Sequence, residues 1–249
     1  MTRYGLIGFP LTHSFSQRYF TEKFVREDIP DSRYDLFEMS DVSVALPDLL
    51  QTPGLRGLNV TIPHKQAVLP YLDRLDSSAE KVGAVNVIKL EADGTKTGFN
   101  SDYYGFKQSL TDWLASLGRT ANGLQALVLG TGGASKAVMV ALADLHIPYK
   151  SVSRKKTADN LTYDELPALI AAYRLIINCS PVGTYPNINE APTLPYDQLT
   201  EQHLLYDLVY NPAETQFMKL GLERGASVMN GYQMLVLQAE KAWEIWQER

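Results

Sequence analysis

Apolar and polar positions alternate along the first hundred residues in a pattern that predicts short strands separated by helices. Short apolar runs predict strands at 4–9, 33–38, 58–62, 85–90 and 95–99. Apolar residues at near-helical spacing predict helices at 16–27, 44–50, 65–72 and 77–82. This alternation indicates a mainly parallel sheet with helices on its faces, which is an α/β fold.

A second unit begins near Tyr103 and has a clearer pattern. Apolar runs predict strands at 124–129, 149–153, 175–179, 204–208 and 226–229. Apolar stripes predict helices at 104–117, 136–145 and 235–246. The first of these strands runs directly into the glycine turn Gly130-Thr131-Gly132-Gly133-Ala134-Ser135. This is the layout of a dinucleotide-binding (Rossmann) domain.

Composition narrows the class of protein. The chain has 249 residues, enough for one large or two small domains, and 45% of them are hydrophobic. A net charge of −5 argues against a nucleic-acid partner. The single cysteine, Cys179, rules out an internal disulfide and fits a reducing compartment. The chain shows no apolar signal region and no apolar stretch long enough to span a membrane, so we expect a cytoplasmic protein.

The glycine turn follows a predicted strand and opens a predicted helix, the context that gives such a motif its meaning. Gly130 permits the tight bend, and Gly132 lets the backbone approach a pyrophosphate. Backbone N–H groups at the start of the helix then face the anion. Ser135 takes the place of the third glycine and is small enough for close helix–strand packing.

The residue that ends the next strand selects the cofactor in such domains, and an acid there favours NAD. The sequence here is Ser153-Arg154-Lys155-Lys156, which contains no acid. Arg154, with Lys155 or Lys156, can pair with a ribose 2′-phosphate, so we favour NADP. The alternative interpretation is a solvated basic loop.

Polar side chains follow the first predicted strand, in the segment 8–16. The paired hydroxyls of Ser14 and Ser16 can recognise a carboxylate, although either serine alone can serve as a helix N-cap. We expect His13 to be structural. The four histidines are scattered and Cys179 stands alone, so we expect no metal site.

Two ionisable residues stand in further polar motifs. Lys65 ends Asn-Val-Thr-Ile-Pro-His-Lys at 59–65, and Asp102 ends Gly-Phe-Asn-Ser-Asp at 98–102. A lysine near a helix N-terminus meets an unfavourable dipole, which argues for a specific role, while a surface charge remains the alternative. Asp102 can instead cap the next helix. Asn86 and Asn100 are candidate ligands of a polyol.

Together these motifs resemble the shikimate dehydrogenase family over nearly the whole chain. The ordered set comprises the motifs at 8–16, 59–65, 83–86, 98–102, 130–135, 178–183, 207–215 and 230–238. The segment 155–171 departs from the family because it is short and poor in the usual second crossover helix.

The resemblance implies reversible NADP-dependent reduction of 3-dehydroshikimate to shikimate, in aromatic amino-acid biosynthesis. It implies a catalytic pair of Lys65 and Asp102. It also implies a substrate site, in which Ser14 and Ser16 hold the carboxylate, hydroxyls are held by Thr61, Asn86, Asn100 and Gln238, and Tyr210 lines the pocket. The cofactor site that we assign comprises Gly130, Gly132, Gly133, Ala134, Ser153, Arg154, Lys155, Ser180 and Gly231.

The family also implies a division of the chain. Residues 1–102 with 230–249 form the substrate-binding and catalytic domain, residues 103–229 form the dinucleotide-binding domain, and the last helix packs back on the first domain. The nearest alternative is a dehydrogenase of quinate, or of quinate and shikimate, that uses NAD. A second alternative is a non-catalytic ligand-binding regulator on the same scaffold. Either a monomer or a homodimer fits the sequence.

Overall fold

The computed structural model describes residues 1–11 and 14–248, so His13 and its expected structural role lie outside the described residues. The chain forms two compact units. The first unit comprises Met1–Ser101 and Ala239–Arg249, and the second comprises Asp102–Gln238. Each unit is described by itself below.

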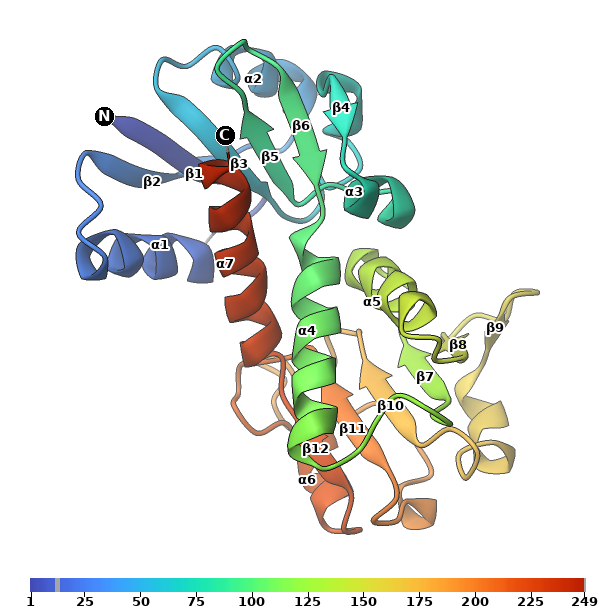
Figure 1. Cartoon of the computed structure of the whole chain (residues 1–249). Coiled ribbons are helices and arrows are strands. Elements are labelled where there is room, and N and C mark those ends of the chain that lie inside the picture. The colour runs from blue at the N-terminus through green and yellow to red at the C-terminus, as the bar shows by residue number, and fades with distance from the viewer. Residues whose placement is uncertain (12–13, 249) are drawn as a thin grey trace. The chain divides into compact units, whose positions relative to one another are not determined.

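The first unit is built on a sheet whose described strands are ordered β2-β1-β3-β5-β6-β4 (Figure 1). They are β1 (Thr2–Gly8), β2 (Ser32–Glu38), β3 (Leu55–Val60), β4 (Arg74–Leu75), β5 (Val87–Leu90) and β6 (Lys96–Phe99). Strand β1 is parallel to both β2 and β3, whereas β5 runs antiparallel to β3 and β6. The prediction of a mainly parallel sheet is confirmed, and the strands predicted at 85–90 and 95–99 form the antiparallel pair β5 and β6.

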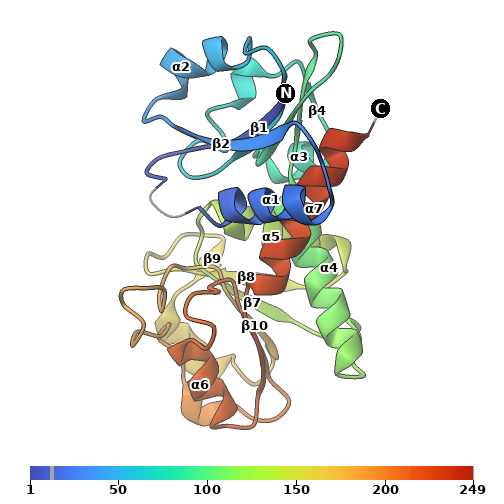
Figure 2. The same ribbon diagram turned by 90° about the vertical axis from the view of Figure 1, so that its left-hand side faces the viewer.

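Helices cover both faces of this sheet, since side chains on a strand alternate between faces. The helices are α1 (Phe15–Arg26), α2 (Val42–Leu49), α3 (Ser77–Val82) and the end of α7 (Tyr232–Gln247). Leu6 packs in a cluster with Phe20 of α1, whereas its neighbour Ile7 packs in another with Leu46 of α2. Figures 1 and 2 show α1 and α2 on opposite sides of the sheet.

The helix predicted at 65–72 is wrong. Residues 62–68 form turns, followed by the 3-10 helix η1 (Leu69–Tyr71). Pro70 explains the difference, because proline has no N–H to donate and its ring clashes with the preceding turn of an α-helix. Lys65 therefore lies in a turn and not in the first turn of a helix.

The last helix supplies part of the core of the first unit. Trp246 of α7 is 6% exposed, stacks on Tyr4 with ring centroids 4.9 Å apart, and donates an indole hydrogen bond of 3.1 Å to the Ile88 carbonyl. The indole lies so close to Gly57 that any Cβ there would collide with it. The predicted packing of the last helix on the first domain is confirmed.

The second unit is built on a sheet whose described strands are ordered β12-β11-β10-β7-β8-β9 and are all parallel. They are β7 (Ala126–Leu129), β8 (Tyr149–Val152), β9 (Asn160–Leu161), β10 (Leu175–Asn178), β11 (Leu204–Asp207) and β12 (Ser227–Met229). Its helical elements are α4 (Ser101–Ser116), α5 (Gly133–Asp144), η2 (Tyr163–Ala168), η3 (Tyr196–Gln198), α6 (Gln216–Leu222) and the start of α7. The predicted Rossmann arrangement is confirmed.

Helices also cover both faces of the second sheet. Val128 packs in one cluster with Phe106 of α4 and Val138 of α5, whereas Leu129 packs in another with Phe217 of α6. Helix α6, of seven residues, was not predicted. Between β8 and β10 the chain forms β9 and η2, which agrees with the expected lack of a regular crossover helix.

Replacing Trp246 by alanine tests the role of α7 in the first unit. We expect Trp246→Ala to lower the free energy of unfolding of this unit by about 3–5 kcal/mol, the usual range for losing a buried aromatic side chain. The exposed Val25→Ala on α1 is the control and should change stability by less than about 0.5 kcal/mol. Urea unfolding of both variants checks this, and equal midpoints would contradict it.

Candidate active site and cofactor pocket

The second sheet has a topological switch point at its first strand, β7. Its neighbours β8 and β10 lie on opposite sides, so the chain leaves β7 and β10 in opposite directions. Ligands of open α/β sheets bind outside the carboxyl ends of the strands at such a point. The glycine turn follows β7 there, and Cys179 and Ser180 follow β10.

The glycine turn has the backbone geometry that the sequence predicted. Gly130 has φ of +100°, which favours glycine, and its N–H donates to the Val152 carbonyl at 2.8 Å. Gly132 caps α5, and a Cβ built on it or on Gly133 would meet no atom within 4 Å, so open space lies before the turn. The buried Ser135 hydroxyl donates to the Gly132 carbonyl at 2.6 Å, and so fixes the turn. The turn therefore fits a dinucleotide whose phosphates lie against the helix start.

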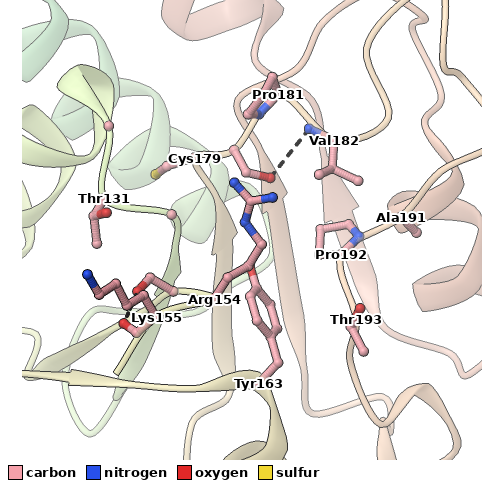
Figure 3. A pocket seen from close by; sticks show the side chains of 14 residues that line it. Thr131, Arg154, Lys155, Tyr163, Cys179, Pro181, Val182, Ala191, Pro192 and Thr193 are labelled. Atoms are coloured by element: carbon pink, nitrogen blue, oxygen red, sulfur yellow. Dashed lines mark hydrogen bonds between the residues drawn. The ribbon is translucent and has the colours of Figure 1, made fainter. Parts of the chain in front are cut away.

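A pocket of about 550 Å³ opens at this switch point (Figure 3). It is lined by Gly130, Thr131, Gly132, Ser153, Arg154, Lys155, Tyr163, Cys179, Ser180, Pro181, Val182, Ala191, Pro192 and Thr193. Six of the residues that we assigned to the cofactor are in this set: Gly130, Gly132, Ser153, Arg154, Lys155 and Ser180. Gly133 and Ala134 begin α5 just beyond the lining, and Gly231 packs tightly against the Leu208 carbonyl.

Sequence reasoning missed one side of the pocket. Tyr163 begins η2, and the segment 191–193 belongs to an irregular stretch between β10 and η3. No periodic pattern marks these residues, because their place depends on how distant segments fold back on the sheet. Figure 3 shows the Arg154 side chain reaching into the pocket between Tyr163 and Cys179, and the Lys155 amine on the side of Thr131.

A buried polar network holds the wall of the pocket near Ser180. The Asn178 side-chain oxygen accepts from the Ser180 N–H at 3.0 Å and from its hydroxyl at 2.6 Å. The Asn178 amide donates to Asp207 at 3.0 Å, and the Thr215 hydroxyl donates to the other Asp207 oxygen at 2.6 Å. Burial raises the pKa of Asp207 to about 6, although hydrogen bonds from Thr215, Val209 and Asn178 oppose the rise. Burial also raises the pKa of the Cys179 thiol.

The first sheet has a similar switch point, because β1 lies between β2 and β3. The loops after β1 and β3 are joined there by a hydrogen bond of 3.1 Å from the Phe9 N–H to the Ile62 carbonyl. Ser14 and Ser16 belong to the first loop and the helix start after it. The Ser14 hydroxyl caps α1 by accepting from the Gln17 N–H at 3.2 Å.

Ser16 and Thr61 are also held by local contacts. Ser16 lies close enough to the buried Tyr34 hydroxyl to oppose the rise in its pKa that burial causes, and this hydroxyl donates to Asn59 at 2.7 Å. Thr61 directly follows β3, and its N–H donates to the Ile7 carbonyl at 2.8 Å. The half-buried Lys65 lies in the turn after it, so these residues gather at one edge of the first sheet.

Asn86 and Asn100 reach the same edge from the antiparallel hairpin. Asn86 precedes β5, its carbonyl accepts from the Val60 N–H at 2.8 Å, and its side chain binds the Ser101 N–H at 2.6 Å and hydroxyl at 3.0 Å. Asn100 follows β6, and its amide donates to the Ala84 carbonyl at 2.9 Å. Both candidate polyol ligands therefore also have structural partners.

Three residues of the proposed catalytic pair and substrate site belong to the second unit. Asp102 lies within the first turn of α4, which begins at Ser101, and is not its N-cap. Tyr210 follows β11 and is 39% exposed, whereas Gln238 of α7 is 8% exposed and its amide donates to the Leu235 carbonyl at 2.8 Å. Since Lys65 belongs to the first unit, its pairing with Asp102 stays a prediction.

The described residues contain neither a cluster of metal ligands nor a helix suited to cross a membrane. Within 1–11 and 14–248, no group of three or more His, Cys, Asp or Glu side chains is placed to hold a metal ion. Over the same residues, no helix combines the length and apolar character that crossing a bilayer needs.

Fold and site together define an α/β protein of two units, one with a dinucleotide-binding turn and pocket and one with a polar sheet edge. The model of the shikimate dehydrogenase substrate binding domain matches residues 6–88. Shikimate dehydrogenase (NADP(+)) of Clostridium beijerinckii is 39% identical over 100% of this chain and 93% of its own length. The chain belongs to the shikimate dehydrogenase family.

Solved structures agree with this assignment. Shikimate 5-dehydrogenase from Thermus thermophilus, in complex with NADP(H) and shikimate, has a TM-score of 0.83 and 28% identity, covering 99% of this chain and 94% of that one. Quinate dehydrogenase from Corynebacterium glutamicum, in complex with NAD, has a TM-score of 0.86 and 26% identity, covering 99% of this chain and 93% of that one. Both structures share the fold of this chain over almost its full length.

Titration of Asp207 gives a pH prediction. Its pKa in the folded protein lies above the ordinary 3.8, so its contribution to stability is present below pH 3.8 and is lost as the pH rises through about 6. Asp207→Asn lacks this titration. The free energy of unfolding of the wild type, minus that of the variant, should therefore fall by up to about 3 kcal/mol between pH 4 and 7. Urea unfolding across this range checks the trend, and a constant or rising difference would contradict it.

Proposed function

We propose that this protein catalyses the reversible NADP-dependent reduction of 3-dehydroshikimate to shikimate, a step of aromatic amino-acid biosynthesis. The observation that carries the proposal is the gathering of hydroxyl, amide and lysine side chains at one edge of the first sheet, in a chain that matches its family over its whole length. Such an edge suits a small polyol that also bears a carboxylate. The second unit supplies the dinucleotide pocket that a redox reaction needs.

In this proposal Ser14 and Ser16 hold the substrate carboxylate. The ring hydroxyls are held by Thr61, Asn86, Asn100 and Gln238, and Tyr210 lines the site. Asn86 and Asn100 can do this while keeping their structural partners, because each side-chain amide has two donor hydrogens and an oxygen with two lone pairs.

Lys65 and Asp102 form the proposed catalytic pair. Reduction of a ketone develops negative charge on its oxygen, which a cationic Lys65 stabilises before it supplies a proton to that atom. Asp102 orients the lysine amine toward that oxygen. In the oxidative direction the pair accepts the hydroxyl proton.

The glycine turn, Arg154 and Lys155 are the residues proposed to hold NADP, together with Gly133, Ala134, Ser153, Ser180 and Gly231. When bound, the nicotinamide supplies the hydride. The N–H groups of the first turn of α5 face the pyrophosphate, and the two cations favour a 2′-phosphate over a free ribose hydroxyl. The pocket thereby supports NADP over NAD.

The division of labour between the units belongs to the same proposal. Residues 1–102 with 230–249 act as the substrate-binding and catalytic domain, and residues 103–229 as the dinucleotide-binding domain. The protein acts as a monomer or homodimer. The lone Cys179 supports a cytoplasmic site of action.

A direct assay tests the reaction. We expect the purified protein to oxidise shikimate with NADP faster than shikimate with NAD, and faster than quinate with either cofactor, as measured by absorbance of the reduced nicotinamide. Faster oxidation of quinate with NAD would favour the quinate alternative. Activity with none of the four pairs would favour a ligand-binding regulator.

Substitution of the proposed pair tests the mechanism. Lys65→Ala and Asp102→Asn should each lower kcat by about 10² or more, the scale of general acid–base catalysis. The controls make matched changes at exposed positions outside the proposed site, Lys219→Ala on α6 and Asp112→Asn on α4, and should keep kcat within about twofold of wild type. Steady-state kinetics measure this, and a near-wild-type kcat for both test variants would reject the pair.

A further inference from the structure

The loop between β8 and β9, residues 153–159, carries three consecutive cations, and we call it the basic loop. Arg154 and Lys155 line the cofactor pocket, whereas Lys156 is not in its lining. All three side chains are exposed. Because like charges repel, the side chains of three neighbouring cations on an exposed loop point in different directions unless other groups fix the conformation of the loop.

Asn160 holds this loop at three points, two on the backbone and one on a side chain. Its side-chain oxygen accepts from the Thr157 N–H at 2.7 Å. Its amide donates to the Lys155 carbonyl at 2.8 Å and to the Ser153 hydroxyl at 2.5 Å. These anchors lie on both sides of Arg154, and the Ser153 hydroxyl itself donates to the Lys155 carbonyl at 2.8 Å.

The position of Asn160 is in turn set by the sheet. Asn160 begins β9 and pairs with Ser151 of β8, and the Ser153 N–H donates to the Leu161 carbonyl at 3.0 Å. Asn160 is 7% exposed, so its amide makes these hydrogen bonds largely out of water. A strand of two residues thus places one side chain inside the loop that it closes.

Lys156 is held by a different group. Its amine donates to both carboxylate oxygens of Glu165 at 2.8 Å, and one of these oxygens also accepts from the Thr162 N–H at 2.7 Å. The hydrogen bond from Lys156 is the main cause that lowers the pKa of Glu165 to about 2. Glu165 is therefore ionised at neutral pH and keeps Lys156 at the start of η2.

We propose that Asn160 is a positioning residue for recognition of the ribose 2′-phosphate: it fixes the basic loop so that Arg154 and Lys155 face the pocket. Glu165 completes the arrangement by holding Lys156 out of it. The inference rests on the proposed function for its ligand, NADP, and goes beyond it by naming residues that do not touch the cofactor.

The physical reason is preorganisation. Contacts between a guanidinium and a phosphate depend on direction, so they are strongest when the loop already has the right shape. A loop that is ordered before binding loses less conformational entropy when the ligand arrives. NAD lacks the 2′-phosphate, so its binding gains little from an ordered loop. Loss of Asn160 should therefore weaken the binding of NADP far more than the binding of NAD.

Asn160→Ala is the test, with adenosine 2′,5′-bisphosphate and adenosine 5′-monophosphate as probes in isothermal titration calorimetry. We expect the dissociation constant of the bisphosphate to rise about tenfold and that of the monophosphate to change less than twofold. In the dehydrogenase assay the KM for NADP should rise to a similar extent. The kcat at saturating NADP should stay within twofold of wild type, which general unfolding of the site would not allow.

Matched variants separate the roles of the loop residues. Arg154→Ala and Lys155→Ala should raise the dissociation constant of the bisphosphate at least tenfold. Lys156→Ala removes an equal charge but should raise this constant less than threefold. Asn122→Ala makes the same change as Asn160→Ala at an exposed loop position outside the pocket and should leave both dissociation constants unchanged. An effect of Lys156→Ala equal to that of Lys155→Ala would overturn the assignment of Lys156.

If Asn160→Ala raises the dissociation constants of both probes equally, or raises neither, the proposed role of Asn160 is wrong. If that variant does not fold, Ser153→Ala removes one anchor and should still weaken the bisphosphate selectively, by about threefold. Failure of the proposed function is a separate result. A wild-type protein that oxidises neither shikimate nor quinate, but whose preference for the bisphosphate depends on Asn160, would reject the enzyme and retain the inference.

Discussion

Parallel pairing of neighbouring strands is the constraint on which both candidate sites depend. In each sheet the first strand of the unit lies between two parallel neighbours: β1 between β2 and β3, and β7 between β8 and β10. The loops at the carboxyl ends of these strands therefore run in opposite directions along the sheet. The loops that diverge there are not covered by a crossover helix. Most of the polar side chains assigned to the substrate in the first unit, and most of the dinucleotide pocket in the second, come from loops at such an edge.

Most strands and helices could be predicted from the sequence, but the two shortest strands could not. The apolar run of β7 and the glycines after it indicated strand, turn and helix together, because only glycine readily adopts the positive φ of Gly130. Strands β4 and β9 have two residues each, which is too short to show a period. The wrong helix at 65–72 follows from reading apolar spacing without giving Pro70 enough weight.

The candidate site was predictable where chemistry is encoded locally. Arg154 and Lys155 follow a strand beside the glycine turn, and both line the pocket. Tyr163 and the segment 191–193 complete that pocket, yet they reach it only through the folding of distant segments. A pattern within a window of ten residues holds no information about such contacts.

Buried amides illustrate a further limit of sequence reasoning. The Asn86 amide has the donors and acceptor needed to bind a polyol, but it binds the backbone N–H and the hydroxyl of Ser101, the first residue of α4. Asp102 is the next residue, so the amide that was assigned to the substrate also fixes the start of the helix that carries one member of the proposed catalytic pair. A residue type and its neighbours cannot separate a ligand from a support, because both roles need the same donors and acceptors.

The same argument applies to the three cations of the basic loop. In the sequence they are equivalent, and any of them can be assigned to a phosphate. Lys156 forms an ion pair with Glu165, which lies nine residues further along the chain. Asn160 hydrogen-bonds the loop on both sides of Arg154, at the Ser153 hydroxyl and the Lys155 carbonyl. The sheet determines where a dinucleotide lies, but the choice between a phosphate and a hydroxyl on its ribose depends on which cations the loop leaves available. That choice is made by residues which bear no positive charge themselves.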